Sequence, residues 1–251
     1  MATLSAHAVS GLPEVRAGDD LAALIVASMT GGHLRDGQVV AIAHKAVSKA
    51  EGAVVSLSEV HAGDRARELG LESDRDPRAV QVVLDETVEV LRAERGVLIC
   101  RTRHGFVCAN AGVDTSNASE PDTVILLPRD PDASARTVRA RLRELTGATV
   151  AVLITDSFGR AWRHGQLDCA VGLAGMSPLE DWRGRTDATG LELKATWLAV
   201  ADAAAGAADL ARAKDSREPV VIIGGLERFV TVGDGPGAAE LLRPLEEDLF
   251  R

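Results

Sequence analysis

The sequence centres on the segment Thr149-Val150-Ala151-Val152-Leu153-Ile154-Thr155-Asp156-Ser157-Phe158-Gly159-Arg160. Its first half is apolar and largely β-branched, which predicts a buried strand over 149–155. Polar residues follow at once and continue through Ala161-Trp162-Arg163-His164-Gly165-Gln166. Because α/β proteins place ligands at the ends of buried strands, we expect a loop here that forms a binding site. The carboxylate of Asp156 and the hydroxyl of Ser157 are expected to hold a metal ion on a nucleotide phosphate.

Length and composition narrow the class of protein. The chain has 251 residues, of which 46% are hydrophobic and 3% aromatic, so it can bury a large aliphatic core. The formal net charge of −9, without a basic block, argues against general binding to nucleic acid. No apolar run approaches the roughly 18 residues of a transmembrane helix, and we expect neither a membrane partner nor a signal peptide. Three well-separated cysteines give no disulfide framework, which predicts free thiols in a reducing cytoplasm.

Strands and helices are expected to follow one another irregularly. Strand patterns cover 4–9, 38–43, 97–101, 123–127, 149–155 and 219–223, and weaker ones cover 105–108 and 166–174. Helical patterns cover 21–29, 76–93, 132–145 and 196–212. Because strict βαβ alternation is missing, we expect an irregular α/β or α+β fold with mixed sheets. No internal repeat or linker is visible, so residues 1–251 are expected to form a single domain.

The common signatures of nucleotide and metal sites are missing from the sequence. There is no GxxxxGK[ST] run, so no P-loop is expected, and no GxGxxG after a strand, so no Rossmann fingerprint. No GxSxG nucleophile elbow occurs. The histidines His44, His104 and His164 lie far apart, which argues against a zinc site.

Hard oxygen ligands are the chemistry that remains. Carboxylates and hydroxyls suit Mg²⁺ or Mn²⁺, which typically take one or two carboxylates together with substrate phosphates. The candidate ligands are Asp114, Asp156 and Ser157, and the cations suited to offset phosphate charge are Lys49, Arg160 and Arg163. Together they have the composition of a phosphoryl-transfer site.

Two polar segments leave alternatives open. Residues 44–52, His44-Lys45-Ala46-Val47-Ser48-Lys49-Ala50-Glu51-Gly52, form either a solvated turn or a segment from which a lysine reaches a phosphate as a point charge. Residues 110–117, Asn110-Ala111-Gly112-Val113-Asp114-Thr115-Ser116-Asn117, form either an ordinary turn or a loop with two functions. In the second case Asp114 is another carboxylate ligand and Asn117 contacts the nucleotide.

Several long motifs occur in one order along nearly the whole chain. They are Gly11-Leu12-Pro13-Glu14-Val15, Gly18-Asp19-Asp20-Leu21, Val47-Ser48-Lys49-Ala50-Glu51-Gly52, residues 110–117, Thr155-Asp156-Ser157-Phe158-Gly159-Arg160-Ala161-Trp162-Arg163, Gly165-Gln166, and Arg243-Pro244 with Glu246-Glu247-Asp248-Leu249-Phe250-Arg251. With these motifs the chain resembles the coenzyme F420-0:L-glutamate ligases, the γ-glutamyl ligase family of deazaflavin cofactor biosynthesis.

The resemblance implies an enzyme that forms an amide bond at the expense of GTP. In that family GTP activates the terminal carboxylate of coenzyme F420-0 as an acyl phosphate, and the amine of L-glutamate displaces the phosphate. Further glutamates are added through γ-linkages. The resemblance also implies a requirement for Mg²⁺ or Mn²⁺, assistance by K⁺, a homodimer and an unusual α/β fold.

Site residues carry over from the family by motif. Leu12, Pro13, Glu14 and Val15 would contact GTP, together with His44, Lys49 and Asn117. Lys49 would lie on the phosphates and would form the catalytic set with Asp114 and Asp156. Asp114, Asp156 and Ser157 would be the metal ligands. The region 212–217 would lie near the nucleotide.

The chain departs from the family pattern at a few positions. His44 stands where a small hydroxyl residue that contacts GTP is usual, and Ala53 stands where arginine is common. Trp197 replaces an acidic residue, and Gly224-Gly225 replaces an Arg-Gly pair. One alternative is therefore a paralogous amide ligase with altered nucleotide or acceptor specificity. Another is a non-enzymatic module that binds a nucleotide or cofactor without turnover.

Overall fold

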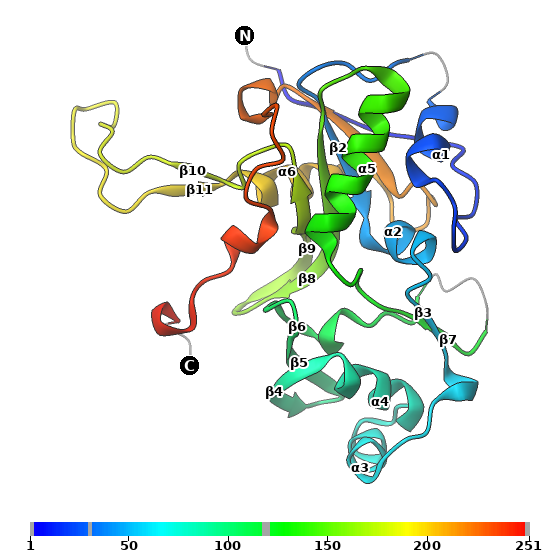
Figure 1. Cartoon of the computed structure of the whole chain (residues 1–251). Helices are drawn as coiled ribbons and strands as arrows, with labels where there is room; N and C mark the ends of the chain where they lie inside the picture. Colours follow the sequence, from blue (N-terminus) through cyan, green and yellow to red (C-terminus); the bar gives the residue numbers. More distant parts are fainter. Residues whose placement is uncertain (1–2, 30–31, 117–120, 249–251) are drawn as a thin grey trace.

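A computed structural model describes residues 3–29, 32–116 and 121–248 (Figure 1). Its centre is a five-stranded sheet in the order β1-β12-β2-β8-β9. These strands are β1 (Ser5–Ala8), β12 (Val220–Gly224), β2 (Val39–Ala43), β8 (Ala151–Arg160) and β9 (Arg163–Ala174). β2 and β8 run parallel, whereas the other neighbours run antiparallel. The expected α/β class with mixed sheets is therefore confirmed.

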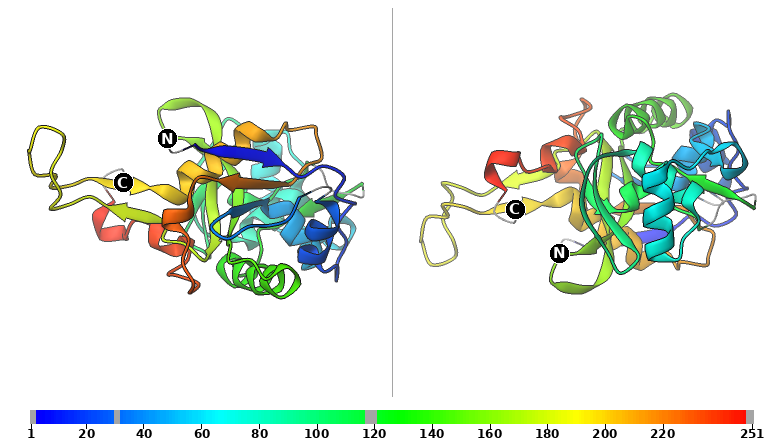
Figure 2. Two further views of the ribbon diagram at one scale, coloured as in Figure 1. Left: turned by 90° about the horizontal axis from the view of Figure 1, so that it is seen from above. Right: turned by 90° about the horizontal axis from the view of Figure 1, so that it is seen from below.

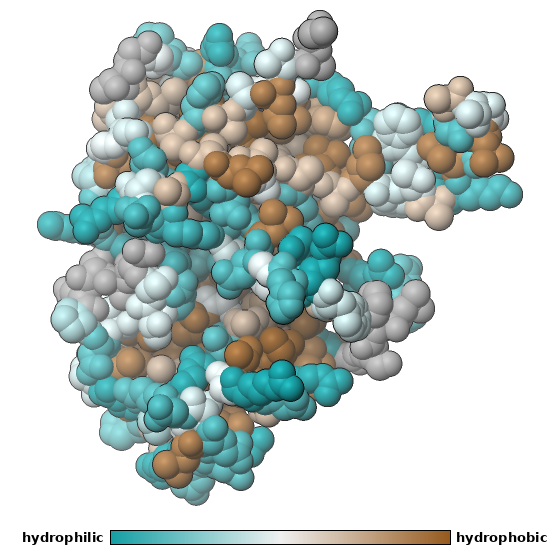
Figure 3. Space-filling view, turned by 180° about the vertical axis from the view of Figure 1, so that it is seen from behind, coloured by the Kyte–Doolittle hydropathy of each residue, from teal (hydrophilic) through white to brown (hydrophobic). Residues whose placement is uncertain are grey.

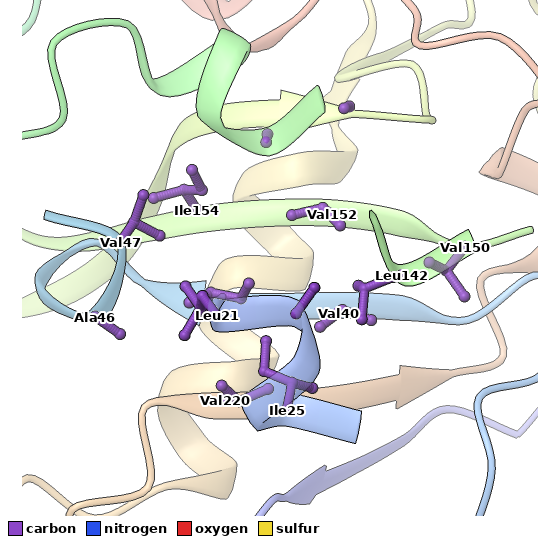
Figure 4. Packing of buried hydrophobic residues seen from close by; sticks show 14 of the residues in the cluster. Leu21, Ile25, Val40, Ala46, Val47, Leu142, Val150, Val152, Ile154 and Val220 are labelled. Carbon is purple, nitrogen blue, oxygen red and sulfur yellow. The ribbon is translucent and has the colours of Figure 1, made fainter. Parts of the chain in front are cut away.

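Helices cover both faces of the central sheet. On one face lie α1 (Leu21–Ser28), α2 (His44–Ala50) and α5 (Pro131–Thr146), and on the other lies α6 (Val200–Ala211). Alternate residues of each strand supply the two cores, as the two-residue period of a strand requires. Val40 and Val152 meet Leu21 and Ile25 of α1 in the first core (Figure 4). The neighbouring strand residues, such as Leu153, meet α6 in the second core.

A third apolar cluster forms below the central sheet in Figure 1. It lies between α3 (Asp64–Ser73), α4 (Pro77–Asp85) and a sheet of β4 (Thr87–Glu94), β5 (Val97–Thr102) and β6 (Val107–Ala109). The chain enters this region through β3 (Val54–Ser56) and leaves it through β7 (Thr123–Ile125), which pairs with β3. Short 3₁₀ turns cover Leu57–Glu59, Asn110–Gly112, Glu227–Phe229, Ala238–Leu241 and Leu245–Glu247.

A two-stranded arm projects from the body beside α6 (Figures 1 and 2). Its paired segments are β10 (Leu179–Asp181) and β11 (Trp197–Ala199). Arg183 lies over the ring of Trp197 at 4.3 Å from its centroid. Hydrophobic and hydrophilic residues share the surface of the arm (Figure 3), and Leu198 is 44% exposed.

The structure corrects several expected elements. The helix predicted over 76–93 ends at Asp85, and the chain continues as strand β4, because the β-branched residues that follow pair with β5. The segment 44–52, one of whose readings was a solvated turn, contains helix α2. The loop expected after 155 is absent, since β8 runs on to Arg160 and forms a hairpin with β9. The helix predicted over 196–212 begins at Val200, and α3 was not predicted.

The remaining expected elements are confirmed to within a few residues at their ends. They are the strands over 4–9, 38–43, 97–101, 105–108, 123–127, 166–174 and 219–223, and the helices over 21–29 and 132–145. Asp20 accepts a hydrogen bond from the Ala23 amide and so caps α1. Within the described ranges, none of the helices has the length and apolar character needed to cross a membrane.

Candidate active site

The parallel pairing of β2 with β8 creates the site. Ala43, the last residue of β2, lies opposite Thr155, and α2 begins at the next residue, His44. Beyond Thr155, β8 continues in its hairpin with β9. The first turn of α2 therefore meets the second half of β8 at the carboxyl edge of the parallel pair, which is where α/β proteins bind their ligands.

The side chains of β8 alternate between the two faces of the sheet along this half. Ile154 and Phe158 pack with the core under α1 and α5, and Asp156 between them lies beside α2. Leu153 packs with the core under α6, and Ser157 points to that same side. Asp156 and Ser157 are neighbours in sequence, but they belong to opposite faces, as the period of a strand requires.

Asp156 lies against a buried histidine. The Nε2 atom of His44 is 3.4 Å from Oδ1 of Asp156, and its Nδ1 atom is 3.4 Å from the hydroxyl of Ser48. Burial lowers the pKa of His44, whose side chain is 2% exposed, so the imidazole is neutral near pH 7. Burial also raises the pKa of Asp156, and the proximity of His44 opposes this only in part. The pair therefore consists of a half-buried carboxyl group and a buried neutral ring.

Asp114 pairs with a lysine from α2. The Nζ atom of Lys45 is 2.6 Å from Oδ2 of Asp114 and donates a hydrogen bond to the Ser116 hydroxyl at 2.9 Å. The Ser116 amide donates to Oδ1 of Asp114 at 2.6 Å. Burial acts to raise the pKa of Asp114, but these donors outweigh it and lower the pKa. Asp114 is thus an ionised carboxylate, and its charge acts on Asp156 through space.

Lys49 lies one turn farther along α2, on the same side as Lys45. Its Nζ atom is 2.5 Å from Oε1 of Glu14, and the Gly18 amide donates to the Ala50 carbonyl oxygen at 2.8 Å. These contacts hold the loop 11–18 against α2. Val15 is buried in the core, whereas Glu14 is exposed. The structure thus brings the predicted residues 12–15 beside Lys49.

A second polar cluster lies on the opposite face of the hairpin and was not predicted as a unit. Asp168 of β9 is 1% exposed and accepts hydrogen bonds from the hydroxyls of Ser157, at 2.7 Å, and Thr155, at 2.9 Å. Arg212, at the end of α6, forms an ion pair with Asp168. Lys214 donates to the Ser157 hydroxyl at 2.7 Å. One feature of the sequence indicates this cluster. Asp168 is the single acidic residue in the strand pattern over 166–174, and a buried charge requires partners.

The remaining predicted residues fall elsewhere. Asn117 lies outside the described residues. His44 is in the site but buried, and Arg160 donates to the His164 carbonyl oxygen at 2.7 Å near the tip of the β8–β9 hairpin. In the described part of the chain no group of three acidic, histidine or cysteine side chains is close enough to hold a metal ion by itself. A metal here would have to be completed by ligands from a substrate or from water.

A cleft of about 820 Å³ lies on the other side of α2. It is lined by Val47 of α2, by Glu51 directly after this helix, and by residues of α1 and α5, among them Ser134 and Arg141. Helical geometry separates Val47 from Lys45 and Lys49, which point toward the acidic residues. The cleft is therefore next to the candidate active site but distinct from it.

Comparison with known proteins assigns the family. Residues 11–225 match the model of the F420-0:Gamma-glutamyl ligase family. The chain is 43% identical to the coenzyme F420:L-glutamate ligase of Methanothermobacter thermautotrophicus over 99% of both chains. It is 46% identical to the Methanopyrus kandleri ligase of the same name, over 95% of this chain and 94% of that one, and 39% identical to the one from Haloarcula marismortui, over 99% and 96%. The chain therefore belongs to the F420-0:γ-glutamyl ligase family.

Proposed function

We propose that this protein is a GTP-dependent ligase that joins L-glutamate to coenzyme F420-0. The observation that carries the proposal is the family match over residues 11–225, with relatives alike over nearly their full length. The site agrees with it in kind, because acidic groups and lysines gather at the carboxyl edge of the parallel strand pair. The proposal includes a homodimer in the cytoplasm, assistance by K⁺ and the addition of further γ-linked glutamates.

The proposed reaction has two balanced steps. An oxygen of the F420-0 carboxylate attacks the γ-phosphorus of GTP, the bond from that phosphorus to the bridging oxygen breaks, and GDP leaves with the bond electrons. The neutral amine of L-glutamate then attacks the acyl carbon. Phosphate leaves with the former carboxylate oxygen, and the amine proton passes to the solvent. Neither step requires a side-chain nucleophile.

The residues of the site would act through charge and position. Carboxylate and triphosphate are both anions, so they must be brought together against their repulsion. Lys45 and Lys49 stand on one side of α2 and can supply positive charge there. Each is already paired, with Asp114 and Glu14, so a bound triphosphate would compete with these carboxylates for the ammonium groups. The loop 12–15 would line the nucleotide beside Lys49.

A divalent ion fits the two carboxylates of the site. Asp156 is half-buried and its close neighbour His44 is neutral, so a cation would offset the cost of desolvating its charge. Asp114 and Asp156 would hold Mg²⁺ or Mn²⁺, ions that take few protein carboxylates and complete their shells with phosphate oxygens and water. When bound, such an ion would supply positive charge that offsets the charge of the transferred phosphoryl group.

The direct test is product formation by the purified chain. With GTP, Mn²⁺, K⁺, L-glutamate and F420-0, mass spectrometry should detect a product heavier by a glutamyl unit, with GDP and phosphate in equal amounts. Asp156→Asn should reduce the rate by about a hundredfold or more, because a charge that acts on the transferring phosphoryl group is lost. The absence of product with both Mg²⁺ and Mn²⁺ would contradict the proposal.

A second candidate is a related amide ligase with a different nucleotide or acceptor. It is favoured by His44, which is buried against Asp156 where the family has a small residue that contacts GTP. A panel of ATP, GTP, CTP and UTP with several carboxylate acceptors would decide between them. A preference for GTP and F420-0 that is unchanged by His44→Ser would rule out this alternative. A protein that binds GTP and Mn²⁺ without releasing phosphate would instead be a binding module.

A further inference from the structure

The hydroxyl of Ser157 is fully engaged by two charged groups. It donates to Oδ1 of Asp168 at 2.7 Å and accepts from Nζ of Lys214 at 2.7 Å. A hydroxyl has a single proton, and an ammonium group can only donate. The direction of both bonds is therefore fixed, with the serine proton toward Asp168 and a lone pair toward Lys214.

Asp168 is held in place from the buried side. Its side chain is 1% exposed, and it forms an ion pair with Arg212, whose side chain is 11% exposed. Arg212 also donates to the Thr155 hydroxyl at 2.7 Å and to the Pro219 carbonyl oxygen at 3.0 Å. Asp168 therefore keeps its position, and with it the orientation of the Ser157 hydroxyl.

The ammonium group of Lys214 lies among oxygen atoms that favour a cation. Besides Ser157, it is 3.1 Å from Oδ1 of Asp209 and 3.7 Å from Oδ1 of Asp168. These three oxygens, two of which belong to carboxylates, surround the ammonium group on the α6 face of the hairpin. The Lys214 side chain is 68% exposed, so an anion arriving from solvent can reach it, whereas Asp168 is covered.

Ser157 is not positioned to share an ion with Asp156. The two side chains point to opposite faces of β8, Asp156 toward α2 and Ser157 toward the end of α6. A divalent ion at Ser157 would also stand beside the Lys214 ammonium, and like charges at such a distance repel. The expectation that Ser157 is a metal ligand therefore conflicts with its surroundings.

We propose that the ammonium group of Lys214 supplies the positive charge on the Ser157 side of the site. Its ammonium takes the place of a metal ion at the Ser157 hydroxyl and binds an anionic oxygen of a substrate directly. Ser157, oriented by Asp168, is then a positioning residue for Lys214. This inference rests on the proposed ligase function, and it confines the divalent metal to Asp114 and Asp156.

Counting bound Mn²⁺ by electron paramagnetic resonance tests the proposal on the full-length chain. Titrations are run with a non-hydrolysable GTP analogue present, for the natural sequence, Ser157→Ala and Asp156→Asn. We expect Ser157→Ala to leave the Mn²⁺ affinity and the number of bound ions unchanged within about twofold, and Asp156→Asn to weaken Mn²⁺ by at least about tenfold. A loss of Mn²⁺ affinity in Ser157→Ala as large as that in Asp156→Asn would overturn the inference.

Substrate binding to variants of Lys214 tests the proposal independently. Lys214→Met should weaken either the GTP analogue or the anionic acceptor by about ten- to a hundredfold, since a hydrogen bond to a charged group is lost. Lys214→Arg should retain most of the affinity. Lys194→Met, the same change at an exposed lysine of the arm, is the matched control and should change neither. Unchanged affinity of Lys214→Met for both ligands would overturn the inference.

The two experiments separate failure of the inference from failure of the proposed function. A natural-sequence protein that binds neither Mn²⁺ nor the GTP analogue would contradict both. A protein that binds both but loses Mn²⁺ in Ser157→Ala would contradict only the role of Lys214. Lys214 is mostly exposed, so its variants are expected to fold, and they remain informative even if Ser157→Ala does not fold.

Discussion

Asp156 and Asp168 are carboxyl groups of one hairpin, the first half-buried and the second buried, and their pKa values shift in opposite directions. Burial raises the pKa of Asp156, and the proximity of His44 opposes this only in part. Burial acts on Asp168 as well, but Arg212 and two hydroxyl donors outweigh it and lower the pKa. Asp168 therefore remains a carboxylate that holds structure, whereas Asp156 is the group that a bound cation would stabilise.

Replacing Asp168 tests its structural role. Asp168→Asn leaves the largely covered guanidinium of Arg212 without its counter-charge, and we expect the free energy of unfolding to fall by about 3 kcal/mol. Urea denaturation at neutral pH measures the change. Asp181→Asn removes the carboxylate of an exposed pair with Arg183 and is the control, with a much smaller effect expected. Equal effects of the two variants would contradict the buried-pair argument.

His104 makes stability depend on pH. Its Nε2–H group donates to the Pro128 carbonyl oxygen at 3.0 Å, and its buried Nδ1 atom has no hydrogen-bond partner among the described residues. Burial lowers the pKa of His104 below the ordinary 6.5, so the unfolded chain takes up a proton that the folded chain does not. The stability that His104 contributes is therefore present above pH 6.5 and lost as the pH falls from 6.5 toward the lowered pKa.

Denaturation at two pH values checks this linkage. Between about pH 7.5 and about pH 5.5 the natural sequence should lose more stability than His104→Gln, which cannot take up the proton. His61→Gln, a change at an exposed histidine, should follow the natural sequence. The same pH dependence in all three proteins would show that His104 is not the source.

At the scale of elements, the β8–β9 hairpin connects the two halves of the site. Its first part is a pair of core strands, and its second part extends past the edge of β2 and carries polar groups on both faces. The strand predicted over 149–155 was right in place but short in length. Because the predicted strand ends at 155, the prediction does not place Asp156 and Ser157 on opposite faces of a strand. The polar composition beyond 155 favoured a loop, and pairing with β9 outweighed it.

The close approach of β9 to α5 depends on Gly172. A Cβ atom at this position would collide with the carbonyl oxygen of Pro131 in the first turn of α5, so backbone must shift. We expect Gly172→Ala to lower the free energy of unfolding by about 1–3 kcal/mol. Gly159→Ala, in the same hairpin, places its Cβ in open space and is the control, with a change within about 0.5 kcal/mol. Thermal and urea unfolding measure the stability of both variants. Equal losses of stability in Gly172→Ala and Gly159→Ala would contradict the argument.

At the scale of the whole molecule, the site is assembled from segments distant in sequence. Five segments meet around the ends of two parallel strands, namely residues 12–15, 44–49, 114–116, 155–168 and 212–214. The motifs predicted the family, which the comparison confirmed. The roles of the acids and of Lys49 stay predictions. The pairing of Asp168 with Arg212 could not be predicted, because it depends on how α6 returns to the hairpin and no local pattern encodes that contact.

Tracing one oxygen atom tests the proposed reaction most directly. F420-0 labelled with ¹⁸O in its terminal carboxylate is incubated with the protein, GTP, Mn²⁺ and L-glutamate, and the phosphate released is analysed by mass spectrometry. Activation as an acyl phosphate predicts that phosphate carries one oxygen from the carboxylate, in step with formation of the glutamyl product. Glutamyl product accompanied by unlabelled phosphate, or GTP hydrolysis without product, would contradict the account.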